Sequence, residues 1–304
     1  MQHLSVCLVC RGSAMKERYP ATFEGTWQEA VPYFLTGRTK AVHGRVMECR
    51  QCGFNFTSPQ FAADDYARIY AAVHAGKVAA DPGAAQARFG ALARQVRSNE
   101  SSGRFLDFGC GSGAFLDEMP GYDGVGFEVA ADVPGGVRRC GALVTGDILA
   151  DNLPNIGLAP ASFDFIVAWD VLEHLADPLA QMQRLNAMLK PSGHLYLTLP
   201  NNASWAARLS GEKWNMLLLE HLWYFDPATV TRFLEHCGFQ VDAISPVGYP
   251  VDVATMFLRA RQTYGRWLPA APPVLGKLVV TLPIGLMFVR ASKTSQDPES
   301  KVKP

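Results

Sequence analysis

The chain has 304 residues, of which 48% are apolar and 18% charged, and its 28 lysines and arginines balance its 28 aspartates and glutamates. This length allows one large α/β core with a small appendage. The zero net charge argues against binding nucleic acid through a general positive charge. The N-terminus shows no basic segment followed by an apolar one, so no secretory signal is visible. Because the 7 cysteines come without such a signal, we expect a cytoplasmic protein whose cysteines bind metal or fill the core.

Two C-x-x-C pairs lie in the first part of the chain, Cys7 with Cys10 and Cys49 with Cys52. Each pair can aim two thiolates at one point, and four thiolates are a tetrahedral set that structural zinc prefers. Gly53 follows the second pair, where a tight turn needs glycine. A redox motif would be a single pair beside a βαβ unit. The pattern therefore favours a structural zinc, with redox use, another metal or free thiols as the alternatives.

The composition changes after the segment that contains the two C-x-x-C pairs. Residues 61–102 are rich in alanine with helical spacing, and Asp81-Pro82-Gly83 interrupts them, which predicts two linking helices. We therefore expect a zinc-ribbon module over residues 1–60, a main domain over residues 103–292 and a polar tail over residues 293–304.

Short apolar segments alternate with helical patterns through the main domain. This alternation predicts a parallel sheet with helices on both faces. The expected strands are 104–110, 123–129, 142–148, 163–175, 194–201, 240–248 and 285–293. The expected helices are 114–119, 178–193 and 226–239.

A glycine-rich turn follows the first of these strands. Asp107 closes the strand, and Gly109, Cys110, Gly111 and Gly113 form the turn. Ligands of parallel sheets bind beyond the carboxyl ends of the strands, and glycines let the backbone approach a ligand closely. The third glycine comes one residue too early for the G-x-G-x-x-G pattern, which argues against NAD.

Acidic and apolar residues end the next strands. Glu128 ends the second strand, where a carboxylate can accept both hydroxyl protons of a ribose. Asp147 and Ile148 close the third strand and can hold the amine and ring face of an adenine. Trp169 ends the fourth strand and is followed by Glu173 and His174.

In this order the motifs resemble those of the class I S-adenosylmethionine-dependent methyltransferases. The shared features are the D-x-G-x-G-x-G turn, the acids after strands two and three, "VLEHLADP" after strand four and "LKPSGHLYLTLPN" through strand five. The resemblance implies a Rossmann-like, seven-stranded, mostly parallel sheet and S-adenosylmethionine as the cofactor. It implies these cofactor-binding residues: Asp107, Gly109, Cys110, Gly111, Gly113, Glu128, Asp147, Ile148 and Trp169.

Some members of one branch of that family carry an N-terminal four-cysteine zinc ribbon, as this chain does at Cys7, Cys10, Cys49 and Cys52. That branch is similar to bacterial enzymes that act on sugars, surface glycans or secondary metabolites. The resemblance therefore implies in-line SN2 transfer of a methyl group to a small-molecule acceptor.

Two histidines are candidates for a general base. His221 follows the segment after strand five, and it can be catalytic, bind the acceptor or be structural. His174, with Glu173, can contact the donor or acceptor, or hold the loop and helix start. His194 begins strand five, at the end away from the ligand edge, so it is discounted.

Other functions use the same residues differently. Asp170, Glu173, His174 and His221 resemble the set with which small-RNA 2′-O-methyltransferases bind a divalent metal. The zinc ribbon also allows RNA or protein recognition, although no stripe rich in lysine and arginine supports a nucleic-acid partner. A module without catalytic activity is a further alternative, which the intact cofactor motifs disfavour.

The segment 248–283 is an apparent insertion rich in aromatics, proline and arginine. It can cap the acceptor site, form a dimer contact or touch a membrane-linked substrate, and the oligomeric state stays open. The apolar run 272–289 contains Lys277 and Pro283 and would barely span a bilayer. We expect buried structure there rather than a transmembrane segment.

Overall fold

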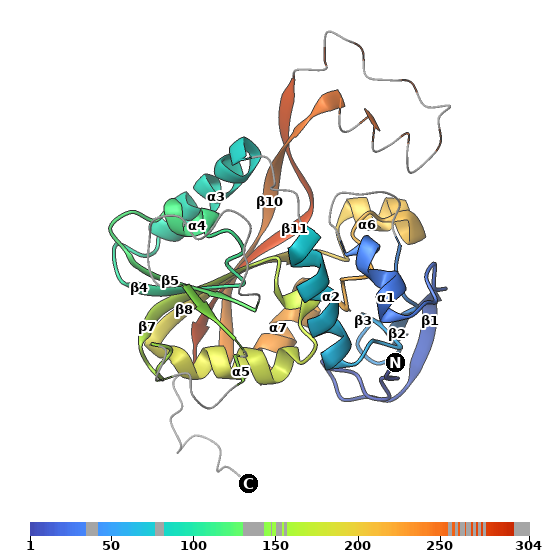
Figure 1. The fold of residues 1–304 in the computed structure, drawn as a ribbon, viewed down its shortest axis with the longest axis horizontal. Helices are drawn as coiled ribbons and strands as arrows, with labels where there is room; N and C mark the ends of the chain where they lie inside the picture. Colours follow the sequence, from blue (N-terminus) through green and yellow to red (C-terminus); the bar gives the residue numbers. More distant parts are fainter. Residues whose placement is uncertain are drawn as a thin grey trace.

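The structure is a computed structural model of the chain. It describes residues 1–34, 42–76, 82–129, 143–146, 148–149, 154, 157–254, 257–258, 261, 265, 269, 272, 275 and 278–294. Within these residues the strands form a seven-stranded and a four-stranded sheet (Figure 1).

The seven-stranded sheet has the order β10-β11-β8-β7-β4-β5-β6. The pairs β4–β5, β4–β7, β5–β6 and β7–β8 are parallel, whereas β11 runs antiparallel to both β8 and β10. The prediction of a seven-stranded, mostly parallel, Rossmann-like sheet is confirmed. Its strands are β4 (Arg104–Phe108), β5 (Asp123–Glu128), β6 (Leu143–Thr145), β7 (Phe163–Trp169), β8 (Leu189–Pro200), β10 (Phe239–Asp252) and β11 (Val279–Lys293).

The strand order reverses at the centre of this sheet. The chain proceeds outward from β4 through β5 to β6, and then returns to β7 and continues outward through β8. A crevice for a ligand forms at such a switch point, beyond the carboxyl ends of the two central strands. The loops after β4 and β7 therefore meet at the expected site.

Helices cover both faces of the sheet, as predicted (Figure 1). Phe105 and Phe165 stack with their ring centroids 5.0 Å apart and belong to a core that includes residues of α3 and α4. Leu106 and Ile166, the next residues along these strands, belong to the other core, which includes residues of α5 and α7. This alternation follows from the two-residue period of a strand. The helices are α3 (Pro82–Arg97), α4 (Ala114–Asp117), α5 (Pro178–Met188), α6 (Trp205–Ser210) and α7 (Pro227–His236).

The helix expected over 178–193 is shorter than predicted. Helix α5 ends at Met188, and β8 begins at Leu189. Pro191 disfavours helical backbone in the residue before it, and Ser192 has a positive φ of 63°. The extra residues form an irregularity in the pairing of β7 with β8, which resumes regular register at His194.

The N-terminal module contains the four-stranded sheet, whose order is β1-β2-β3-β9. Three strands come from the module: β1 (Met15–Tyr19), β2 (Val46–Cys49) and β3 (Asn55–Thr57). The fourth, β9 (Trp223–Tyr224), comes from the main domain, between β8 and α7. The short helices α1 (Trp27–Ala30) and η1 (Val31–Tyr33) and the longer helix α2 (Ala63–Gly76) complete this part of the molecule (Figure 1). The module and the main domain therefore share a sheet.

The two ends of the expected insertion 248–283 belong to strands. Strand β10 reaches Asp252, β11 begins at Val279, and these two residues pair. The two strands form a long ribbon that rises beyond the rest of the sheet (Figure 1). The residues between them are described only in part, so a role as acceptor cap, dimer contact or membrane contact stays a prediction.

Among the described residues of the apolar run 272–289, the buried ones lie near its C-terminal end. Leu286 is buried, as are the three residues after it, whereas Leu275 and Leu278 expose 37% and 50% of their surface. Pairing of β11 with β8 begins at Leu286, so the residues before it have only β10 as a neighbouring strand. Among the described residues, none of the helices is both long and apolar enough to span a membrane.

Candidate active site

The glycine-rich turn after β4 has the backbone shape that its sequence predicts. Gly109, Gly111 and Gly113 have φ values of 76°, 52° and 75°, in the left-handed region that favours glycine. The N–H groups of Gly109 and Cys110 both donate to the carbonyl of Phe127, at 2.8 and 3.0 Å. The turn is therefore tied to the neighbouring strand β5 by its own backbone.

Two of these glycines are needed for different reasons. A Cβ atom on Gly109 would lie 2.6 Å from Val171 Cγ2, so packing alone excludes a side chain there. A Cβ atom on Gly111 would meet nothing within 4 Å. The space beside Gly111 lets a ligand approach the backbone, as the cofactor loop of the expected fold requires.

Asp107 is the most unusual group beside this turn. It is 1% exposed, and its Oδ2 atom has no hydrogen-bond partner. Burial, together with the nearby charge of Glu128, raises the pKa of Asp107 to about 8. A buried carboxyl oxygen without a partner is costly, and a cationic ligand group would relieve that cost. Asp107 thus fits the amino group of S-adenosylmethionine.

Glu128 is held at the end of β5 by backbone donors. Its Oε2 accepts from the N–H of Gly111 at 2.9 Å, and its Oε1 accepts from the N–H of Val129 at 3.0 Å. Each carboxylate oxygen has a second lone pair. The half-buried carboxylate is therefore oriented and can still accept from the hydroxyls of a ribose.

The predicted adenine contacts are placed only in part. Asp147 lies outside the described residues. Ile148 is 3% exposed and packs in the core that includes residues of α5 and α7. Its contact with an adenine ring stays a prediction.

Trp169, at the end of β7, is part of a buried aromatic cluster. Its ring centroid lies 5.0 Å from that of Phe115, in a tilted arrangement, and 6.1 Å from that of Phe288, in a stacked one. Its Nε1–H is buried and has no acceptor. Trp169 thus packs in the core beside the turn and has a donor group that the protein leaves unsatisfied.

The residue after Trp169 ties three elements together. Asp170 has a φ of 54°, and its Oδ1 accepts from Thr198 Oγ1 of β8 at 2.7 Å. Its Oδ2 forms an ion pair with Arg88 of α3. Sequence reasoning missed Arg88, because nothing distinguishes it within an alanine-rich helical segment.

Glu173, His174 and His221 form a compact cluster next to this edge. One potential ligand atom from each lies within 4.8 Å of the others. Glu173 is 1% exposed, and neither of its carboxyl oxygens has a hydrogen-bond partner. Burial, with the charge of Asp170 next in importance, raises the pKa of Glu173 well above its ordinary value. The two predicted catalytic histidines thus lie together, beside an unsatisfied carboxyl group.

Backbone carbonyls orient both imidazoles. Nδ1 of His174 lies 2.9 Å from the carbonyl of Glu220, and Nδ1 of His221 lies 2.8 Å from that of Met216. A carbonyl only accepts, so in each hydrogen bond Nδ1 carries the proton and Nε2 keeps a lone pair. Burial, with the neighbouring His174, lowers the pKa of His221 well below its ordinary value. His221 is therefore a neutral imidazole with a lone pair on Nε2.

The four cysteines of the module also come together. Sγ of Cys7 lies 3.6 Å from Sγ of Cys52, and Sγ of Cys10 lies 3.5 Å from Sγ of Cys49. A tetrahedron with zinc–sulfur bonds of about 2.3 Å has edges of about 3.8 Å. The donor set and its spacing therefore fit a structural zinc ion.

His194 was predicted to lie away from the ligand edge of the sheet, and it takes part in a separate polar cluster. Its Nδ1 lies 2.8 Å from Glu100 Oε1, which also accepts from the Tyr196 hydroxyl at 2.6 Å. His194 pairs with Phe165, near the start of β7, whereas the active-site loop follows the end of that strand. His194 has a structural environment.

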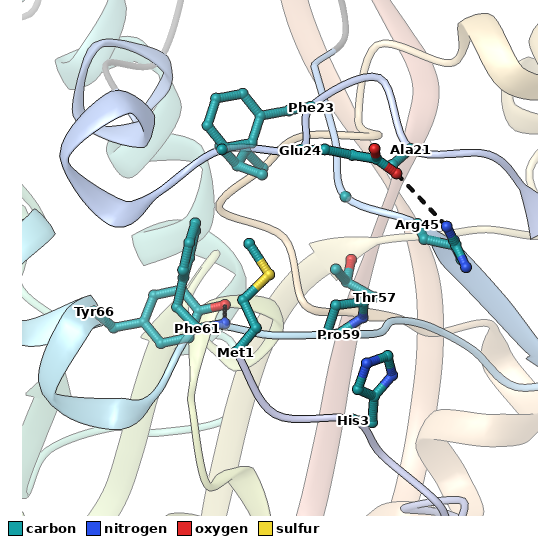
Figure 2. Close-up of a pocket in the computed structure, with 13 residues that line it drawn as sticks. Met1, His3, Ala21, Phe23, Glu24, Arg45, Thr57, Pro59, Phe61 and Tyr66 are labelled. Atoms are coloured by element: carbon teal, nitrogen blue, oxygen red, sulfur yellow. Dashed lines mark hydrogen bonds and ion pairs between the residues drawn. The ribbon is translucent and has the colours of Figure 1, made fainter.

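A pocket of ≈ 270 Å³, not anticipated from the sequence, is lined almost entirely by residues from the N-terminal part of the chain. Figure 2 shows Phe61 and Tyr66 on one side of it and the ion pair of Glu24 with Arg45 on the other. The main domain contributes Leu219, two residues before His221. The lining residues are Met1, His3, Ala21, Phe23, Glu24, Gly25, Gly44, Arg45, Thr57, Pro59, Phe61, Tyr66 and Leu219.

The chain is similar to several known proteins. A ubiquinone biosynthesis O-methyltransferase of Xanthomonas euvesicatoria is 27% identical over 167 residues, which cover 51% of this chain and 70% of that enzyme. One from Vibrio cholerae is 28% identical over 159 residues, which cover 48% and 64%. A solved structure described as a SAM-dependent methyltransferase from Archaeoglobus fulgidus is 18% identical, with a TM-score of 0.48, and the match covers 70% of this chain and 95% of that one.

The chain also matches a protein family. Residues 84–244, which make up more than half of the chain, match the family described as a methyltransferase domain. This range includes the glycine-rich turn, Glu128, Trp169 and both histidines of the cluster. The chain therefore belongs to this methyltransferase-domain family and is a class I S-adenosylmethionine-dependent methyltransferase.

Proposed function

We propose that the chain methylates a hydroxyl group of a small-molecule acceptor. One observation carries this proposal: the unsatisfied carboxyl of Asp107 and the open backbone at Gly111 lie at the sheet edge shared with the loop of Glu173 and His174. The first two features suit the methyl donor. His221 is the candidate base, because its Nδ1 is bonded to the Met216 carbonyl and its ligand atom lies within 4.8 Å of those of that loop.

The proposed cofactor contacts follow the arrangement of the site. Bound S-adenosylmethionine supplies a methyl group activated by its sulfonium, so the main task of the protein is alignment. Asp107 would accept from the amino group, Glu128 would accept from the ribose hydroxyls, and Gly111 would leave room for the chain between them. Asp147 and Ile148 would contact the adenine. Trp169 would line the donor side of the site.

The proposed base is His221, with His174 as its neighbour. The hydrogen bond from Nδ1–H to Met216 leaves Nε2 to take the acceptor's hydroxyl proton. The positive charge that then forms on the imidazole favours ionisation of the neighbouring Glu173 carboxyl group, and the resulting carboxylate would stabilise it. His174, whose ring centroid is 4.7 Å away in a T-shaped contact, restricts the orientation of His221.

The acceptor that we propose is a sugar, a glycan unit or a secondary metabolite with a free hydroxyl. Two observations support a hydroxyl acceptor of this size. The relatives described above are named O-methyltransferases, and the chain has no net charge with which to attract a polyanion.

The test is binding followed by a panel of acceptors. Calorimetry on the purified, zinc-loaded protein should detect S-adenosylmethionine binding. Formation of S-adenosylhomocysteine should then be measured with nucleotide sugars, phenols and an RNA oligonucleotide. Turnover on a sugar or phenol that His221→Gln abolishes, while donor binding persists, supports the proposal. Turnover on RNA alone would contradict it.

A metal-assisted reaction is a second candidate, and the cluster of Glu173, His174 and His221 supports it. Two imidazoles with anchored Nδ1 atoms and one carboxylate are a set that binds divalent metals, and such ions act as Lewis acids at an acceptor oxygen. Asp170, the fourth member of the expected set, already pairs with Arg88. Turnover that survives EDTA with unchanged rate would contradict this candidate, including its 2′-O-methylation form.

A further inference from the structure

We propose that Thr57, in the zinc-bearing module, is a positioning residue for His221. Through Thr57 the four-cysteine site would help to set the geometry of the acceptor side of the active centre. The importance of this contact for activity rests on the role proposed above for His221. The contact itself rests on the shared sheet.

The first link is the pairing of β3 with β9. Asn55 pairs with Tyr224 and Phe56 pairs with Trp223 in antiparallel register. Thr57, the last residue of β3, extends this ladder, because its N–H donates to the carbonyl of Leu222 at 2.8 Å. The module's strand thus runs directly alongside the residues that follow His221.

The second link is a side-chain hydrogen bond to His221 itself. The Thr57 hydroxyl donates to the carbonyl of His221 at 3.1 Å. Thr57 is 3% exposed and His221 5%, so this hydrogen bond is almost fully buried. The carbonyl of His221 therefore depends on the module for its position.

The third link joins the same segment to the loop after β7. The N–H of Leu222 donates to the carbonyl of Glu173 at 2.8 Å, while its carbonyl accepts from Thr57. The Trp223 indole donates to the carbonyl of Leu175 at 2.7 Å. Displacement of β3 would thus change the positions of His221 and of the loop that holds Glu173.

The fourth link reaches the zinc-binding turn. The N–H of Cys49 donates to the carbonyl of Phe54 at 2.8 Å, and the N–H of Gly53 donates to the carbonyl of Cys49 at 2.9 Å. The Phe54 ring stacks on Trp223 of β9, with centroids 6.3 Å apart and the planes 12° from parallel. The knuckle that would hold zinc therefore packs on the strand that follows the candidate base.

The test follows the His221 imidazole directly and needs no acceptor. In protein labelled with ¹⁵N-histidine, the Nδ1–H of His221, bonded to Met216 and buried, should give a slowly exchanging NMR signal at neutral pH. Thr57→Val, which keeps the side-chain shape but loses the hydroxyl, should shift or broaden this signal. Thr57→Ser should restore it. Loss of zinc through Cys49→Ser, which leaves the cluster of Glu173, His174 and His221 unaltered, should have the same effect as Thr57→Val.

The matched control is Thr229→Val. Thr229 is also buried, 1% exposed, and its hydroxyl caps α7 instead of contacting His221. Thr229→Val should leave the His221 signal unchanged. In a separate measurement, S-adenosylhomocysteine should bind Thr57→Val with the same affinity as it binds the unmodified protein. An unchanged His221 signal in both Thr57→Val and Cys49→Ser would overturn the inference. Failure of the unmodified protein to bind the donor would instead contradict the proposed function. The comparison of His221 signals between the variants would still test the role of Thr57.

Discussion

The donor half and the acceptor half of the active centre are built in different ways. The centre of the proposed donor half is one continuous stretch, in which β4, the glycine-rich turn and β5 hold one another through adjacent backbone, and Ile148 and Trp169 lie farther along the chain. The acceptor half joins the loop after β7, the segment before β9 and a strand of the N-terminal module. A local motif can therefore form a donor site, whereas the acceptor site needs three distant segments to fold together. Perturbations of the module should consequently separate donor binding from turnover.

The largest effect should come from losing the zinc site. Cys49→Ser removes one of four thiolates, and because structural zinc in small domains binds with an apparent free energy of about 10–16 kcal/mol, metal content should fall from about one ion per chain to almost none. We expect turnover to be lost while donor binding persists. Metal analysis and calorimetry measure these two results. Cys237→Ser, at a buried cysteine outside the cluster, is the control. Zinc retained by Cys49→Ser would refute the ribbon assignment.

The next largest effect should be on catalysis alone. His221→Gln removes the proposed base, and since general bases typically contribute about 10²–10⁴-fold, turnover with an acceptor from the panel should fall within that range. The donor affinity should not change. His194→Gln, in the separate cluster with Glu100, should leave turnover nearly intact. Equal losses in the two variants would show that His221 has no special role.

A third variant should affect only the donor half. Glu128→Ala removes the proposed ribose acceptor, and two charge-assisted hydrogen bonds of about 1.5 kcal/mol each correspond to a loss of about 100-fold in donor affinity. The fold should persist, because the half-buried carboxylate bonds only backbone at the edge of the sheet. Calorimetry gives the affinity, with the exposed Glu235→Ala as control. If Glu128→Ala binds the donor with unchanged affinity, Glu128 does not contact the donor.

The smallest effect should be a pH dependence that arises from Asp107. Because burial raises its pKa to about 8, a cationic amino group should bind more tightly as pH rises through this value. Asp107→Asn should remove this dependence and weaken binding by about tenfold above pH 8, as expected for one charge-assisted hydrogen bond. Calorimetry across this pH range measures both. A slope that persists in Asp107→Asn would assign the dependence to another group.

The same pKa predicts the stability of the protein without its ligand. Ionising a carboxyl whose folded-state pKa is raised costs stability, so the penalty grows as pH increases from 3.8, the ordinary pKa of the group, to about 8. At pH 7 the unliganded Asp107→Asn variant should therefore melt at a higher temperature than the unmodified protein. At pH 4 the difference should vanish.

Much of the fold and of the donor site follows from residues close together in the sequence. Alternating apolar strands and helical patterns predicted a parallel sheet with helices on both faces, and the family resemblance implied its seven strands. The three glycines have the positive φ angles that the turn needs. The paired cysteines likewise predicted one cluster. These features depend on backbone conformation and strand periodicity, which are set over a few residues.

Only the tertiary structure decided how the acceptor half is assembled. It showed that Arg88 pairs with Asp170, that Glu173 lies buried without a partner, and that β9 joins the module's sheet so that Thr57 contacts His221. No local pattern contains this information, because each contact joins segments far apart in the chain. Such contacts depend on the summed packing of two cores and on which strand edges remain free to pair. The sequence by itself determined the sheet, the donor turn and the metal-binding cysteines, while the packing of distant segments determined which side chains meet the acceptor.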